Sequence, residues 1–78
     1  MTDAAKSEQK DRTEGERRVR KSFNPNGNPD VEKVKQLSAA LIDLVREHPA
    51  AASDPRLAAL AMTAYEEAAM WAVKLVTA

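Results

Sequence analysis

The C-terminal segment from Pro55 to Ala78 is apolar on nearly every side if it is drawn as a helix. Its charged residues are only Arg56, Glu66, Glu67 and Lys74, and small or apolar residues fill most other positions. A helix that is hydrophobic all round has to be buried on all sides. The rest of the chain offers one further amphipathic helix, so the remaining cover must come from other copies. The pattern therefore predicts an obligate homo-oligomer with its functional grooves between subunits.

The shortness of the chain points to the same source of stability. Of its 78 residues, residues 1–22 are polar and charged, which leaves about 56 to fold. Domains of that size usually need disulfides, a metal or association with other chains. The sequence has no cysteine and a single histidine, His48, so we expect no disulfide and no metal site. We expect a charged arm over residues 1–22 and one folded domain over residues 23–78.

The charge pattern limits the classes of partner. The net charge is zero, with seven basic and five acidic residues in 1–22 and five basic and seven acidic residues in 23–78. This balance argues against a protein that coats DNA or RNA polymers. The N-terminus lacks the apolar region of a signal peptide. The run over residues 57–78 is long enough to span a bilayer, but Glu66 and Glu67 at its middle would be very costly there. We therefore expect no membrane partner.

Two helices are predicted, each with its own start signal. Asn28 is a good N-cap and Pro29 fits a first helical position, and Asp54 and Pro55 repeat this device. Pro49 ends the first helix, which gives helices over about 29–47 and 55–78 joined by a short connection at 50–53. The predicted fold is all-α, a two-helix antiparallel hairpin. Residues 1–22 are expected to be a flexible or short-helical arm in which Gly15 interrupts any helix.

Each predicted helix carries more apolar surface than contact with one neighbouring helix would bury. In the first helix, Lys35 is assigned to the polar face. In the second, which has two apolar faces, we assign the first face to the other helix of the hairpin and the second face to a partner chain, although the sequence does not fix which is which. Trp71 is expected to be a core anchor. The first helix carries Val34, Leu37, Leu41 and Leu44, widened by Val31, Ala39, Ile42 and Val45. The two faces of the second are Leu57, Leu60, Ala64, Ala68, Trp71 and Leu75, and Met62, Tyr65, Ala69, Val73 and Val76.

No catalytic constellation is visible in the sequence. Glu66 and Glu67 are adjacent, so on a helix they point about 100° apart and cannot act as a paired acid and base. We expect a protein that is not an enzyme and has no cofactor. Phe23 follows Arg20 and Lys21 and precedes a turn-rich loop. It could staple the loop onto the helices, or it could stack on a nucleobase while the two cations hold phosphate.

The segment from Arg56 to Ala72 resembles a known family. It contains an Arg, a small and apolar stretch, Thr63 and then Glu-Glu-Ala-Ala-Met-Trp-Ala. This pattern is similar to the hairpin domain of phage anti-CBASS and Thoeris anti-defence proteins. The resemblance extends upstream to the basic residue and Phe loop between Arg20 and Pro25, about 55 residues in all. It implies a small helical protein that assembles as a hexamer in the cytoplasm of the infected bacterial host.

The resemblance also implies a function and a site. Members of the family hold cyclic dinucleotides or cyclic trinucleotides made by bacterial immune systems without cleaving them, and others take cyclic ADP-ribose isomers. The chain departs from the members that bind cyclic dinucleotides, because residues 1–22 lack the aromatic residue that stacks on a base. Phe23 takes that role, or this site is lost or prefers another ligand. The implied ligand-binding residues are Arg20, Lys21, Phe23, Asn24, Pro25, Arg56 and Thr63.

Two other functions remain open on the sequence alone. One is a structural or adaptor hairpin that binds another protein through the exposed surface of the second helix. The other is a nucleic-acid-binding hairpin that uses Arg17, Arg18, Arg20 and Lys21. A panel of ligands separates these alternatives, because only a nucleic-acid binder responds to DNA in a salt-dependent way.

Overall fold

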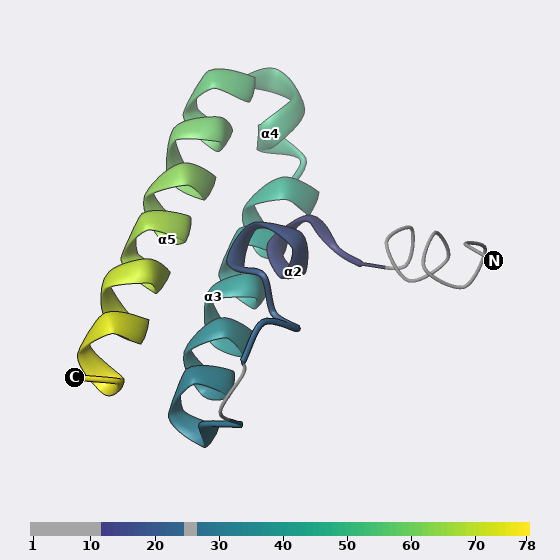
Figure 1. Cartoon of the computed structure of the whole chain (residues 1–78). Coiled ribbons are helices and arrows are strands. Elements are labelled where there is room, and N and C mark those ends of the chain that lie inside the picture. Colours follow the sequence, from purple (N-terminus) through teal and green to yellow (C-terminus); the bar gives the residue numbers. More distant parts are fainter. Residues whose placement is uncertain (1–11, 25–26) are drawn as a thin grey trace, which may run out of the picture.

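The computed structural model describes residues 12–24 and 27–78, and every regular element in these residues is helical. The two long helices lie antiparallel as a hairpin, a one-turn helix forms its tip, and a short N-terminal helix packs against the hairpin (Figure 1). The elements are α2 (Glu14–Val19), α3 (Pro29–Glu47), α4 (Ala50–Ser53) and α5 (Pro55–Val76). The predicted all-α hairpin is therefore confirmed.

The long helices begin at the residues that the caps predicted. The Asn28 side chain accepts hydrogen bonds from the Asp30 and Val31 amides, at 2.8 and 3.2 Å. The Asp54 side chain accepts from the Leu57 amide at 3.0 Å. Each cap satisfies donors that have no partner inside the helix. α3 ends at Glu47 as predicted, α5 ends two residues short of the expected 78, and the connection forms α4.

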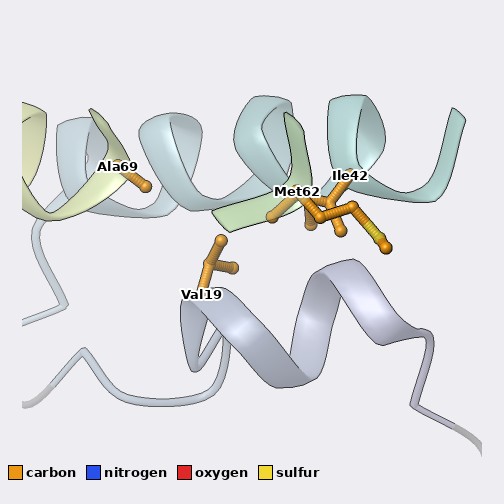
Figure 2. Close-up of a cluster of buried hydrophobic side chains, with 5 residues drawn as sticks. Val19, Ile42, Met62 and Ala69 are labelled. Atoms are coloured by element: carbon orange, nitrogen blue, oxygen red, sulfur yellow. The ribbon is translucent and has the colours of Figure 1, made fainter. Parts of the chain in front are cut away.

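The core lies where α2, α3 and α5 meet. Val19 of α2 points toward Ile42 of α3 and Met62 of α5, and Ile42 is fully buried (Figure 2). Ala39 and Ala69 complete this cluster, and their small side chains let the helices approach closely. The core is small, which is the expectation for a chain of this length.

The predicted assignment of the two faces of α5 was wrong. Met62 and Ala69 of the second face are buried against α3, while Leu57, Leu60 and Trp71 of the first face are largely exposed. The small residues at the α3–α5 contact explain the difference, because they allow a closer helix pair than two rows of leucines would. Trp71 is likewise not a core anchor within one protomer.

The expectation that Gly15 interrupts any helix was also wrong, because Gly15 is buried inside α2. A Cβ atom at Gly15 would lie 2.0 Å from the Ala39 carbonyl oxygen of α3, so only glycine permits this approach. The Gly15 amide donates to the Asp43 carboxylate at 2.7 Å. Thr13 and Glu16 form a capping box at the start of α2. The expected arm over residues 1–22 therefore includes a helix that packs on the hairpin.

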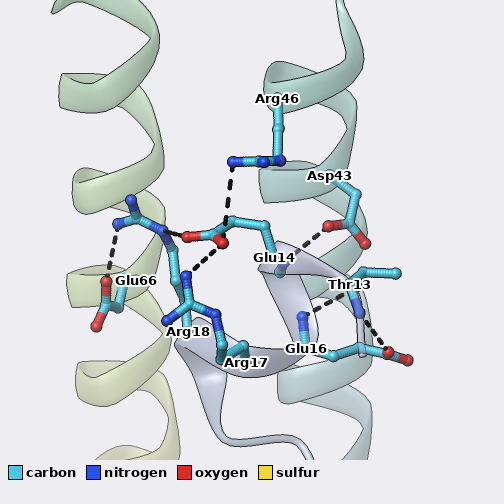
Figure 3. Close-up of polar contacts among 9 residues, drawn as sticks. Thr13, Glu14, Glu16, Arg17, Arg18, Asp43, Arg46 and Glu66 are labelled. Carbon is cyan, nitrogen blue, oxygen red and sulfur yellow. Dashed lines mark hydrogen bonds and ion pairs between the residues drawn. The ribbon is translucent and has the colours of Figure 1, made fainter. Parts of the chain in front are cut away.

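An ion network joins α2 to the other two helices (Figure 3). Glu14 accepts from Arg17 and from Arg18, the latter at 2.7 Å, and Arg46 of α3 lies 3.9 Å away. Arg18 also reaches Glu66 of α5 at 3.2 Å. Hydrogen bonds from Arg17, and then from Arg18, hold the pKa of Glu14 below its usual value. Glu14 therefore stays ionised to a lower pH than an unpaired glutamate does.

Replacing Gly15 by alanine should destabilise the fold by about 1–3 kcal/mol, because the new methyl group overlaps backbone atoms of Ala39 that cannot rotate away. Thermal denaturation followed by circular dichroism would measure this. Gly27→Ala is the matched control, since Gly27 has a φ of 61° but open space around it. That variant should show only the cost of backbone strain, about 1 kcal/mol. Equal or smaller effects at Gly15 would contradict the close contact.

Replacing Glu14 by glutamine should remove a pH-dependent part of the stability. A folded pKa below the unfolded one stabilises the fold above the usual glutamate value of about 4.3, and this is lost as the pH falls through the folded pKa. The free energy of unfolding of wild type should exceed that of Glu14→Gln by a few tenths to about 1 kcal/mol at pH 7, and the difference should shrink as the pH falls below the usual glutamate value. Urea denaturation at several pH values measures this. Glu67→Gln, on an exposed residue of α5 that makes none of these ion pairs, is the control. An equal effect in both variants, or a difference for Glu14→Gln that does not change with pH, would contradict the network.

Candidate functional site

The segment after α2 is held in a tight turn that presents Phe23. Arg20 caps α2 in the left-handed conformation, with φ 55° and ψ 54°. The Lys21 amide donates to the Glu16 carbonyl at 3.0 Å, which is a common way to end a helix. The Phe23 amide then donates to the Arg20 carbonyl at 2.8 Å. These bonds fix the direction in which the chain leaves α2.

Phe23 combines an exposed aromatic ring with two nearby cations. The residue is 55% exposed. The Arg20 guanidinium carbon lies 4.7 Å from the ring centroid, and the Lys35 ammonium lies 5.3 Å from it. Both distances are within the range of cation–π attraction. An exposed ring beside fixed positive charge suits a ligand with both a flat base and a phosphate.

Lys35 lies inside the structure rather than on the polar face that the sequence predicted. It is only 7% exposed, and its ammonium donates to the Arg20 carbonyl at 3.0 Å and to the Phe23 carbonyl. Burial lowers the pKa of Lys35, and the charge of Arg20 lowers it further. The sequence did carry a signal, because Lys35 lies four residues after Val31 and four before Ala39, which are both buried.

Three hollows open around Phe23. A cleft of about 270 Å³ lies between this ring and α5, where it is lined by Arg18, Glu66 and Met70 among others. A second, of about 510 Å³, runs from Phe23 to the C-terminal end of α5. A third, of about 260 Å³, is lined by Arg12, Arg17, Arg20, Ser22 and Phe23. The third hollow is suited to an anion, since its charged lining residues are all arginines.

The other loop residues that the sequence singled out have different roles. Both atoms of the Asn24 side-chain amide bond to Asn28, with the nitrogen donating to the Asn28 carbonyl at 2.9 Å and the oxygen accepting from the amide at 3.1 Å. Asn24 thereby closes the loop before α3. Lys21 is half-buried and lies 3.9 Å from the Glu16 carboxylate. Pro25 lies outside the described residues.

Arg56 and Thr63 are not brought to Phe23 within one protomer. Both are exposed residues of the first half of α5. Arg56 is separated from Val73, which lines the clefts at Phe23, by about 25 Å of helix. Arg56 therefore lies near the tip of the hairpin, away from Phe23, while Thr63 lies between the two along α5 and lines none of the three hollows.

The outer faces of α3 and α5 carry an unusual amount of apolar surface. Large apolar residues along both helices are between 42% and 75% exposed. Isolated exposed leucines are ordinary, but contiguous rows of them mark contact surfaces. We call this surface the outer apolar face. It consists of Leu37, Leu41, Leu44, Leu57, Leu60, Trp71 and Leu75.

The fold and site define a helical-hairpin protein with a cationic, aromatic loop beside its short N-terminal helix. The family model described as the Acb2/Tad1 hairpin domain matches residues 14–77. The chain therefore belongs to this family of phage anti-defence hairpin proteins, whose members are known as binding sponges rather than enzymes. The resemblance noted in the sequence is confirmed, and the match includes α2. No curated protein and no solved structure gives a significant match to the chain.

Two further observations concern the described residues only. None of their helices is long and apolar enough to cross a membrane. No group of three or more potential metal ligands occurs among them.

Proposed function

We propose that this protein is a phage anti-defence sponge that sequesters cyclic oligonucleotide immune messengers without cleaving them. The observation that carries this proposal is the exposed Phe23 ring with the Arg20 guanidinium 4.7 Å from its centroid, in a chain of the Acb2/Tad1 family. A cyclic oligonucleotide offers bases to stack on a ring and phosphates to pair with cations. Such a protein would act in the cytoplasm of the infected bacterium, where its messengers are made.

Assembly is the second part of the proposal. The outer apolar face is more than a soluble monomer normally leaves exposed, and contact between copies would cover it. We propose a homo-oligomer, with the hexamer that the family resemblance implies. Arg56 and Thr63, which do not line the hollows at Phe23 in one protomer, would then belong to a different contact between subunits.

The sequestering mechanism is supported by how the acidic residues are used. Glu66 pairs with Arg18 at 3.2 Å, and Glu14 is held by Arg17 and Arg18. These ion pairs give both carboxylates a role in holding α2 and in joining it to α5. Binding is then the whole of the proposed activity.

Wild type should bind a cyclic dinucleotide or trinucleotide from a panel of cyclic di-AMP, cyclic GMP–AMP, cyclic tri-AMP and cyclic ADP-ribose isomers. Arg20→Gly keeps the left-handed backbone while it removes the guanidinium, and Lys21→Ala and Arg56→Ala remove the other cations. Loss of a charge-assisted phosphate contact should weaken binding roughly tenfold to a hundredfold. Native mass spectrometry and calorimetry would measure stoichiometry and affinity.

Lys33→Ala is the control for these variants, because Lys33 is an exposed residue of α3 that lines none of the hollows at Phe23. Ligand released by denaturation should be chemically unchanged. A linear nucleotide product would overturn the sequestering mechanism, while unaltered affinity in all three variants would overturn only the choice of residues.

Replacing Trp71 by alanine should weaken assembly, by roughly 3–5 kcal/mol per subunit if the ring is packed between copies. Sedimentation velocity over a dilution series would measure the shift toward smaller species. Gln36→Ala, on an exposed polar residue of α3, should leave assembly unchanged. A wild-type protein that is a monodisperse, cooperatively melting monomer at micromolar concentration would contradict the proposal.

The outer apolar face also supports a second candidate, an adaptor hairpin that binds another protein. The two candidates differ in their response to small molecules. A sponge is stabilised by particular cyclic nucleotides through mass action, whereas an adaptor responds to none of them. Thermal shifts with the panel, beside linear DNA at two salt concentrations, separate these candidates from a nucleic-acid binder.

A further inference from the structure

Lys35 is a buried lysine held by backbone carbonyls. The residue is 7% exposed, and no carboxylate lies within ion-pair distance of its ammonium among the described residues. Buried lysines are rare and are normally paired with an acid. Lys35 instead donates to the carbonyls of Arg20 and Phe23. The buried charge is therefore used to hold the turn between Arg20 and Phe23.

The two carbonyls belong to the two residues that make up the candidate site. Arg20 supplies the guanidinium and Phe23 supplies the ring. The Arg20 carbonyl already accepts from the Phe23 amide at 2.8 Å, so the Lys35 ammonium joins both ends of the same turn. Arg20 is also the only non-glycine residue with a positive φ in the described part of the chain. Lys35 thus holds a strained backbone conformation from which both side chains project.

Lys35 also lines two of the hollows at Phe23, but it is almost entirely buried and bonded to the turn. We infer that Lys35 is a positioning residue, which acts on the ligand by holding Arg20 and Phe23. This inference rests on the proposed function, because it assigns a role within the same site. The ammonium has three donors, of which two are taken by carbonyls, and it lies 5.3 Å from the Phe23 ring centroid. Most of its bonding capacity is therefore used inside the protein.

A purely structural role of Lys35 predicts different effects on ligand affinity and on folding stability. Desolvation lowers the pKa of Lys35, which means that burying its charge opposes folding. Removing the buried charge relieves this cost, but it also takes a donor from the Phe23 carbonyl, so the two effects on stability oppose each other. Lys35→Met keeps the length of the side chain and removes the donors. A positioning role predicts lower ligand affinity without lower stability, whereas a structural role predicts that both fall together.

The test compares four full-length proteins with a cyclic di-AMP and cyclic tri-AMP panel. Lys35→Met should bind at least tenfold more weakly than wild type while its melting temperature is unchanged or higher. Lys35→Arg keeps the cation and its donors and should bind within about threefold of wild type. Lys33→Met removes the same charge from an exposed position of the same helix, and should match wild type in both measurements. Lys35→Gln, which keeps amide donors, serves if the methionine variant does not fold, and should fall between wild type and complete loss.

Hydrogen exchange of the Phe23 amide gives a readout that needs no ligand. This amide donates to the Arg20 carbonyl, so it should exchange at least tenfold faster in Lys35→Met than in Lys33→Met. If wild type binds no nucleotide, the proposed function fails, and faster exchange still supports the positioning of the turn. Wild-type affinity in Lys35→Met, unchanged exchange at Phe23, or a parallel loss of affinity and stability in both Lys35→Met and Lys35→Arg would overturn the inference.

Discussion

The contact between Gly15 of α2 and Ala39 of α3 is the constraint on which the arrangement of the three helices depends. A Cβ atom at Gly15 would meet the Ala39 carbonyl oxygen at 2.0 Å, so the two backbones are about as close as helices can come. This approach lets Asp43 cap the Gly15 amide and lets Val19 reach the core beside Ile42 and Met62. A six-residue helix is too short to be stable alone. Its tertiary contacts therefore decide whether α2 exists at all.

Close packing of small residues also decides which surface is left outside. Ala39 of α3 and Ala69 of α5 are buried in one cluster with Ile42 and Met62, and Ala58 of α5 is buried as well. The leucines of both helices consequently face away from the core, together with Trp71. The bulkiest apolar residues of the hairpin are largely exposed within one protomer, which is typical of a surface that contacts another chain. The proposed assembly follows from this arrangement, in which small residues fill the contact between the helices and large apolar residues lie outside.

The helix boundaries were predictable from the sequence, whereas the packing of the helices was not. The Asn28–Pro29 and Asp54–Pro55 pairs act locally, so their effect can be derived from the neighbouring residues alone. The choice between two apolar faces of α5 depends on the fit to α3, which periodicity does not encode. Gly15 was misread for a related reason, since its low helix propensity is outweighed by a tertiary contact that only glycine permits.

Of the candidate site, the sequence identified Arg20 and Phe23 but missed the residue that holds them. Lys35 was assigned to the polar face because lysine is usually exposed. Its spacing from Val31 and Ala39 placed it on the buried face, and this geometric signal was stronger than residue type. The site is therefore joined to the core at two points. Arg20 caps α2, which Gly15 brings into close contact with α3. Lys35 belongs to α3 and bonds to the Arg20 carbonyl. A ligand that contacts Arg20 and Phe23 would thus bind to a turn that α2 and Lys35 fix to the packed core of the protein.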